Sequence, residues 1–210
     1  MRSSLLILLL LEWPCMSDAQ AYTGFEQYMY VYKAAPLLVV PVIYYQSEQN
    51  WFIQSNMNYE QPKTFSVSAG KTFSEDDEFF WSVTPMIGLV SGSLNGAVMA
   101  LNTEVRYKKI LYTSQSHFVY SFKNTESDLL SSWMELGYQV IGQMFAGLSV
   151  QATVINATDM QMETGVFIRV NVKKWGFPVY CFNTASNNRY FTLGITREFS
   201  LPANKKIAVQ

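Results

Sequence analysis

Apolar and polar residues alternate along most of the chain between Trp51 and Phe199. The alternation is clearest in residues 162–173, where one face carries Thr164, Val166, Ile168, Val170 and Val172. The other face of this segment carries mostly polar or small residues, and residues 144–155 and 64–74 repeat the pattern. A period of two with one apolar face predicts β-strands that turn one side toward an apolar environment.

The strand-length segments follow one another with short connections. Each segment is long enough to cross a bilayer at a tilt, which takes roughly 9 to 11 residues. The tightest connections are Lys108-Lys109, Ile141-Gly142-Gln143 and Lys174-Trp175-Gly176, and turns this short join antiparallel neighbours. The predicted strands are residues 37–46, 51–60, 64–74, 79–90, 97–107, 110–122, 130–140, 144–155, 162–173, 176–184 and 189–199.

Strand parity decides how the barrel begins. A single-chain bacterial barrel has an even number of strands, whereas the predicted strands give an odd number. One solution is a first strand within residues 22–36, around 25–33. The other is that residues 22–36 are an N-terminal segment and that 37–46 lies outside the barrel. Pro41 disfavours 37–46 as a central strand. We predict an all-β, antiparallel up-and-down transmembrane β-barrel of about twelve strands, with ten as the alternative.

The parity also assigns the connections to two sides. The strand that ends at Phe199 is expected to run toward the periplasm, where turns are short. Counting back from it, the three tight turns fall on the periplasmic side and the longer stretches 123–129, 156–161 and 184–188 fall on the outer side. The acidic connection 74–78 is long for the periplasmic side to which it is assigned.

The first residues have the features of an export signal. Arg2 precedes the apolar run Leu5–Leu11, which is too short to span a bilayer, and Ala19-Gln20-Ala21 is an A-x-A cleavage sequence. We therefore predict that residues 1–21 are removed and that residues 22–210 form a single barrel domain with a C-terminal tail at 200–210. The residues before Cys15 are too large for a lipid-attachment site.

Composition fits a barrel that faces lipid. Charged residues make up 15% of the chain, against about 25% in soluble domains, and charge on a lipid-facing surface is costly. The alternation of apolar and polar residues alone does not distinguish a membrane barrel from a soluble sheet packed on a core. We expect the polar faces to hold small residues and paired charges without bulky filling, and the strand-end aromatics to form interfacial belts. These aromatics are Trp51, Tyr59, Phe73, Phe79, Trp81, Tyr107, Tyr112, Trp133, Trp175, Tyr190 and Phe199.

The last predicted strand resembles the C-terminal assembly signal of bacterial outer-membrane barrels. Thr192, Gly194 and the terminal aromatic Phe199 match that signal, whereas Arg197 stands where an apolar residue is usual and residues 200–210 follow the aromatic. The resemblance implies that the barrel-insertion machinery reads this strand. The stretches Trp51–Glu60, Gly70–Phe73 and Phe182–Phe191 resemble small porin-like outer-membrane barrels of Bacteroidota-type bacteria. That general resemblance spans most of the chain after residue 21, and the class implies no active site and no particular solute.

The polar faces supply candidate lumen residues of both charge signs. Paired across the lumen, they would form a network that fills a narrow barrel; around an open pore, they would set its selectivity. We favour a structural network with limited permeation, and neither sign dominates. The candidates are Asn56, Asn58, Glu60, Asn102, Glu104, Arg106, Gln115, His117, Glu135, Glu163, Arg169, Lys173 and Glu198.

Other chemistry finds little support. A barrel hydrolase would need a serine near His117, and Ser121 is too far along the same extended strand. The chain has one histidine and no cluster of thiols, which disfavours a transition-metal site. The acidic run Glu75–Glu78 lacks the spacing of a calcium-binding loop. No phosphate-binding loop or dinucleotide-binding motif appears, so no cofactor is expected. The net charge of −1 provides no basic field for nucleic acid.

Three hypotheses remain. The first is an integral barrel of the bacterial outer membrane with a porin-like role, the passive passage of an unidentified small solute, or a structural role; its partners are outer-membrane lipid and the insertion machinery. The second is a secreted, water-soluble barrel that binds an apolar ligand and has the opposite polarity. The third is a membrane-embedded hydrolase centred on His117.

Overall fold

The computed structural model describes residues 20–123, 128–155 and 160–201. The predicted signal peptide lies almost entirely outside these residues, as does the predicted tail. The described residues form β1 (Tyr22–Val31), β2 (Leu38–Gln46), β3 (Trp51–Met57), β4 (Thr64–Lys71), β5 (Phe73–Glu75), β6 (Phe79–Gly92), β7 (Gly96–Tyr107), β8 (Ile110–Ser121), β9 (Leu129–Ile141), β10 (Met144–Ile155), β11 (Gln161–Val172), β12 (Trp175–Phe182) and β13 (Tyr190–Ser200). They contain no helix that is long and apolar enough to cross a membrane.

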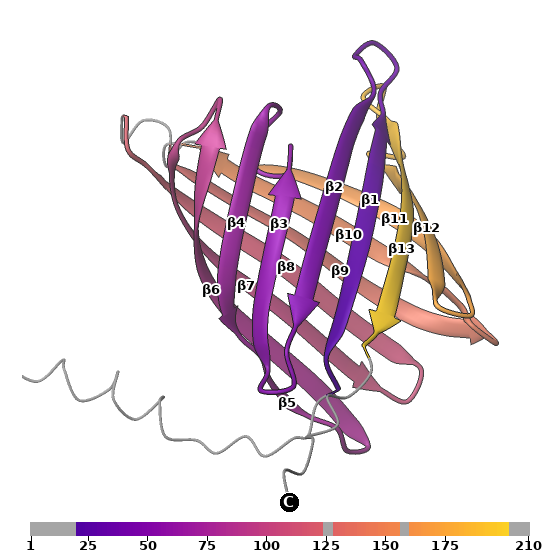
Figure 1. Cartoon of the computed structure of the whole chain (residues 1–210). Coiled ribbons are helices and arrows are strands. Elements are labelled where there is room, and N and C mark those ends of the chain that lie inside the picture. Colours follow the sequence, from indigo (N-terminus) through magenta and orange to yellow (C-terminus); the bar gives the residue numbers. More distant parts are fainter. Residues whose placement is uncertain (1–19, 124–127, 156–159, 202–210) are drawn as a thin grey trace, which may run out of the picture.

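The strands close into an antiparallel barrel (Figure 1). β1 pairs with β13, and β4 pairs with β6, so no edge remains open. β4 and β5 pair with successive parts of β6 and form one strand interrupted at Thr72, whose backbone N–H donates to Asn50 O instead. The barrel therefore has twelve strands, which confirms the predicted fold and the first strand within residues 22–36.

The connections differ in length at the two ends of the barrel. β1 begins and β13 ends at the same end, which we call the terminal end; the opposite end is the loop end (Figure 1). The two-residue turns 108–109, 142–143 and 173–174 lie at the terminal end, as the parity predicts. Lys108 (φ 53°) and Lys173 (φ 57°) adopt the left-handed conformation that tight hairpins favour. Lys173, predicted to lie on a strand face, is thus a turn residue.

The apolar faces of the strands point outward. In β11, Val166, Ile168 and Val170 are 48%, 50% and 39% exposed, whereas Phe167 between them is 2% exposed. In β4, Phe65 and Val67 are exposed and Ser66 and Ser68 are buried. This is the polarity that the membrane-barrel hypothesis predicts, and the water-soluble alternative required the reverse.

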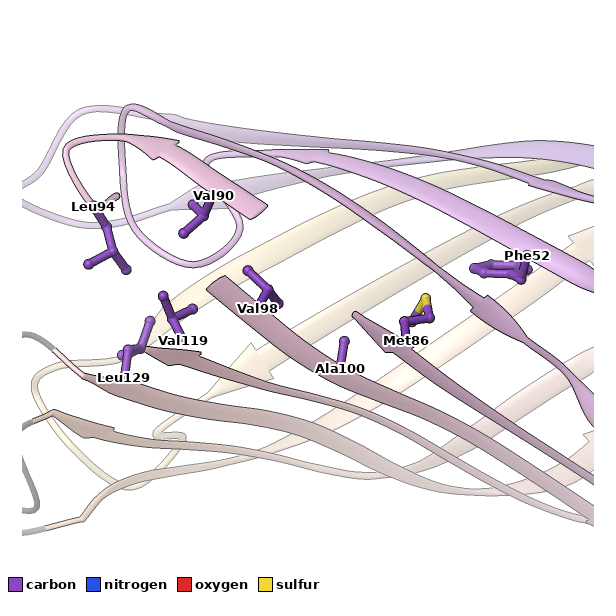
Figure 2. Packing of buried hydrophobic residues seen from close by; sticks show 8 residues of the cluster. All are labelled: Phe52, Met86, Val90, Leu94, Val98, Ala100, Val119 and Leu129. Carbon is purple, nitrogen blue, oxygen red and sulfur yellow. The ribbon is translucent and has the colours of Figure 1, made fainter. Parts of the chain in front are cut away.

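The interior is bulkier than predicted. One buried cluster, here the aromatic cluster, contains Tyr28, Val40, Phe167, Tyr180, Phe182 and Tyr190, with Trp133 packed against it. A second cluster, the aliphatic cluster, contains Phe52, Met86, Val90, Leu94, Val98, Ala100, Val119 and Leu129, which lie inside the wall formed by β3 and β6–β9 (Figure 2). The prediction of inward faces without bulky filling was wrong, because a period of two assigns side chains to a face but does not say which large ones meet across the lumen.

Fewer aromatic residues than predicted lie in an interfacial belt, and they lie at one end of the barrel. Tyr59, Trp133 and Tyr190 face the interior, so these three were wrongly assigned to a belt. The other eight predicted belt residues stand on the outward rows of their strands, close to the terminal end. Trp51, for example, begins β3 and is 58% exposed. The described residues therefore place these aromatics around one end of the barrel.

Candidate functional site: the barrel lumen

Two cavities lie inside the barrel. The larger, of about 600 Å³, opens toward the terminal end and is lined by Glu26, Glu104, Glu135 and Glu198, among others. The smaller, of about 300 Å³, lies toward the loop end between Gln151, Glu163 and Asn188. The aromatic cluster stands between them: Tyr28 and Trp133 border the larger cavity, while Tyr30 and Tyr190 are within hydrogen-bond distance of Gln151, which lines the smaller one.

A buried ion pair crosses the larger cavity. Arg169 Nη2 of β11 donates to Glu135 Oε2 of β9 at 2.6 Å, and Tyr180 OH of β12 donates to Glu135 Oε1 at 2.7 Å. Glu135 is 6% exposed, so its charge depends on these two donors. The structure therefore brings two of the sequence-predicted residues together and adds Tyr180, which the sequence gave no reason to include.

Glu163 is held at the loop end. Tyr190 OH donates to Glu163 Oε2 at 2.7 Å, and Asn183 Nδ2 donates to Glu163 Oε1 at 3.1 Å. Tyr190 belongs to the aromatic cluster. The contact ties the wall of the smaller cavity to the aromatic layer below it.

The connection 58–63 between β3 and β4 folds into the lumen. β3 pairs with β2 only over Phe52–Asn56, and after Met57 the chain turns at Asn58 (φ 59°). Asn58 Nδ2 donates to Val39 O at 2.9 Å, so the side chain replaces a ladder contact that β3 no longer provides to β2. Asn58 and Glu60, predicted on a strand face, lie in this connection because the strand ends three residues earlier than predicted.

Tyr59 and Glu60 bind β8 on the far side of β6 and β7. Tyr59 OH donates to Gln115 Oε1 at 2.8 Å, and the Tyr59 ring centroid lies 4.6 Å from that of His117. Glu60 Oε1 lies 3.3 Å from His117 Nδ1 and accepts a 2.6 Å hydrogen bond from Ser66 Oγ. Both the Glu60 and the His117 side chains are fully buried. We call Tyr59, Glu60, Gln115 and His117 the latch.

Glu60 is the acidic group of the latch. Burial alone would raise the pKa of the Glu60 carboxyl, but hydrogen bonds with His117 and Ser66, together with the nearby His117, lower the pKa below its ordinary value. The connection is therefore held most strongly when Glu60 is ionised.

The remaining predicted residues fall into smaller groups. Asn102 Nδ2 donates to Gln54 Oε1 at 3.0 Å, and Gln54 Nε2 donates to Asn56 Oδ1 at 2.9 Å. At the terminal end, Arg106 Nε lies 3.0 Å from Glu104 Oε1, and Glu198 Oε1 accepts a hydrogen bond from Tyr44 OH at 3.2 Å. The Asn102–Gln54 contact joins β7 to β3 and the Tyr44–Glu198 contact joins β2 to β13, which are not neighbouring strands, whereas Arg106 and Glu104 lie on the same strand. Among the described residues, these groups do not form one continuous network with Arg169 and Glu135.

Sequence reasoning missed a polar group near the terminal end. Thr72 Oγ1 donates to Gln46 Oε1 at 2.9 Å and lies 2.9 Å from Thr84 Oγ1, and Gln46 Nε2 donates to Asn50 Oδ1 at 3.1 Å. The alternation of the sequence could have identified these residues, since each of them lies on an inward row or in a turn. Only the closure between β4 and β6 shows that they meet.

Ser131 is the serine that a His117 hydrolase would need. It lies directly opposite His117 in the β8–β9 ladder, and both Ser131 Oγ and His117 Nε2 are buried without a hydrogen-bond partner in the described structure. His117 is 0% exposed, so no substrate carbonyl can reach it in this arrangement. Among the described residues no group of three or more acidic, histidine or cysteine side chains is placed to hold a metal ion.

The residues of the predicted assembly signal lie on both faces of β13. Thr192 is fully buried and Phe199 faces outward at 37% exposure. Gly194 faces inward, where a Cβ would lie 2.6 Å from Pro178 Cγ and 3.0 Å from Tyr28 Cε1. Glycine at this position is thus required by packing within the barrel, whatever reads the strand.

Comparison with solved structures places the fold among porin barrels. The KdgM porin is similar with a TM-score of 0.61 and 13% identity over 84% of this chain and 99% of that one. A KdgM porin in complex with disordered oligogalacturonate gives a TM-score of 0.60 and 13% identity over 85% and 99% of the two chains. The NanC porin gives 0.54 and 9% identity over 84% and 100%. No family model matches the chain, and no curated protein matches it. The likeness is one of fold: a closed twelve-strand porin barrel.

Proposed function

We propose that the protein is an integral barrel of the bacterial outer membrane, with a porin-like role in which passage of small solutes is restricted by the latch and the aromatic cluster. The chain is exported by the signal in residues 1–21 and inserted by the barrel-insertion machinery. The observation that carries this proposal is the outward apolar surface around a closed barrel with a polar cavity at its terminal end. No residue is assigned a catalytic role.

The outward surface supports the membrane location. The outward side chains of Ile87, Leu89 and Leu148 are 73%, 63% and 59% exposed. Apolar side chains are favourable on a surface that contacts hydrocarbon. Backbone groups inside a bilayer must pair internally, and the closed ladder from β1 to β13 meets that requirement.

The lumen supports restricted passage. The larger cavity would admit a small solute from the terminal end, but Tyr28 and Trp133 close its inner side. On the other side of the lumen the latch holds Tyr59 against Gln115 and His117. The latch is thus one of two restrictions on passage, and movement of the connection 58–63 away from β8 would relieve it.

Conductance in planar bilayers tests the proposal. The wild-type protein should insert and show small or rare conductance steps, and the double variant Tyr59→Ala/Glu60→Ala should conduct more strongly, because both contacts with β8 are lost. Tyr45→Ala is a matched control, since Tyr45 is 40% exposed on the outer face and its loss should leave conductance unchanged.

Two outcomes would count against the proposal. A protein that carbonate extracts from membranes without detergent is not an integral barrel. A wild-type conductance that the double variant does not raise would show that the latch does not restrict the lumen. If both proteins insert and neither conducts, a structural role replaces the porin-like one.

A further inference from the structure

Arg197 lies on the outer surface of the barrel, near the terminal end. Its neighbours in β13, Thr196 and Glu198, face the lumen, so Arg197 points the other way. Its cross-strand partners are Phe25 of β1 and Trp175 of β12, and Trp175 is the first residue of its strand. Arg197 is thus a cation on the outward row of β13, among the outward aromatic side chains of the terminal end.

Two aromatic rings flank the Arg197 guanidinium. Its Cζ lies 4.5 Å from the ring centroid of Trp175 and 4.4 Å from that of Phe199. Phe25 and Phe177 pack on Trp175 in turn and fix its position. Rings stacked on a guanidinium do not pair with its N–H groups, and the terminal N–H groups can still donate to the oxygens of a phosphate or carboxylate.

The described residues contain no anion that pairs with Arg197. The salt bridges found among them join Arg106 to Glu104, His117 to Glu60 and Arg169 to Glu135. Arg197 Nε is buried and has no hydrogen-bond partner. The adjacent carboxylate of Glu198 faces the lumen and accepts from Tyr44. The charge of Arg197 is therefore unmatched within the described chain.

The place of Arg197 near the end of β13, among outward aromatics, is the level at which lipid headgroups are expected if the barrel spans a membrane. Lys174, in the turn just before Trp175, donates from Nζ to Ser200 Oγ at 3.1 Å, and Ser200 stands on the inward row of β13, so this second cation lies on the lumen side of the rim. The outward aromatics described above, which include Trp51 and Trp175, lie at this end on β3, β5–β8, β12 and β13. Tryptophan and tyrosine gather where hydrocarbon meets headgroups.

We propose that Arg197, held between Trp175 and Phe199, binds the phosphate of an anionic phospholipid on the outer wall of the barrel. This inference rests on the proposed membrane location. It also explains why a charged residue is tolerated in the closing strand, since a charge costs much less at the interface than at the bilayer midplane and a bound phosphate offsets that cost.

Lipid binding to the purified full chain in detergent tests this site. Phosphatidylglycerol should bind in native mass spectra and raise the thermal midpoint of the wild-type protein, and phosphatidylcholine should do so more weakly. Arg197→Gln should weaken phosphatidylglycerol binding about tenfold, the loss of one charge-assisted contact. The affinity of Arg197→Lys for phosphatidylglycerol should lie between those of the wild type and Arg197→Gln, because an ammonium cannot make the paired contact. Trp175→Leu should weaken binding although the charge of Arg197 is retained.

Arg189→Gln is the matched control, because Arg189 is exposed in the connection 183–189 at the loop end. Binding of phosphatidylglycerol to Arg197→Gln with wild-type affinity would overturn the inference, as would equal binding of the two lipids by the wild type. Insertion into liposomes separates the two proposals: a chain that inserts but shows no preference disproves the lipid site alone, whereas a chain that does not insert disproves the membrane location.

Discussion

Glu60 Oε1 lies 3.3 Å from His117 Nδ1, although the two residues are 57 positions apart in the sequence. This contact holds the connection between β3 and β4 inside the barrel, where Tyr59 meets Gln115. Because both side chains are fully buried, removal of one partner leaves the other without a compensating group.

The lowered pKa of Glu60 predicts acid sensitivity. A carboxyl whose pKa is lower in the folded state contributes stability above its unfolded pKa, and that contribution is lost as pH falls through the folded pKa. Denaturant unfolding measured from pH 7 to pH 3 should show the wild type losing more stability than Glu60→Gln. Glu78→Gln, at an exposed turn, should follow the wild type. Parallel profiles for wild type and Glu60→Gln would contradict the role assigned to this carboxylate.

The Arg169–Glu135 pair predicts an asymmetric response to mutation. Arg169→Met should lower the free energy of unfolding by about 3–5 kcal/mol, because it leaves a buried carboxylate with Tyr180 as its remaining donor. The double variant Arg169→Met/Glu135→Leu should recover most of this loss, since it removes both charges. Urea unfolding in detergent measures both values, and a double variant less stable than the single one would argue against a buried pair.

The outer face of β11 predicts that the free-energy cost of an introduced arginine depends on its depth in the bilayer. Ile168→Arg should cost about 2–4 kcal/mol, because the residue lies in the middle of the strand and points outward, whereas Val172→Arg at the strand end should cost about 0–1 kcal/mol. The two residues are similarly exposed, at 50% and 51%, so exposure alone cannot explain a difference. Refolding into lipid vesicles measures the two costs, and equal costs would mean that hydrocarbon does not cover this face.

Gly194 predicts a packing defect. Gly194→Ala should destabilise the barrel by about 1–3 kcal/mol, because the added Cβ would overlap Pro178 and Tyr28. Gly142→Asn is a control at a turn with φ 52° and no atom within 4 Å of a built Cβ, and asparagine tolerates that backbone conformation. Thermal unfolding of the purified variants compares them. A neutral Gly194→Ala would leave recognition by the insertion machinery as the reason for glycine at this position.

The sequence by itself determined most of the strands, their antiparallel order and which residues of a strand share a face. The period of two put Val166, Ile168 and Val170 on one face and Arg169 on the other, and the parity of the turns left a first strand in residues 22–36 as one of two solutions, the one that the structure shows. These features are local, since each depends on neighbours within one strand or one hairpin.

Only the tertiary structure decided what meets inside the barrel. The latch requires that β3 end at Met57 and that the chain enter the lumen, and the aromatic cluster requires that Tyr28, Phe167 and Tyr180 converge from β1, β11 and β12. Alternation assigns these residues to the interior, but their contacts depend on barrel closure and strand stagger, which are global quantities. The same holds for Arg197: its place on the outer face follows from alternation, whereas the rings that flank it come from the pairing of β12 with β13.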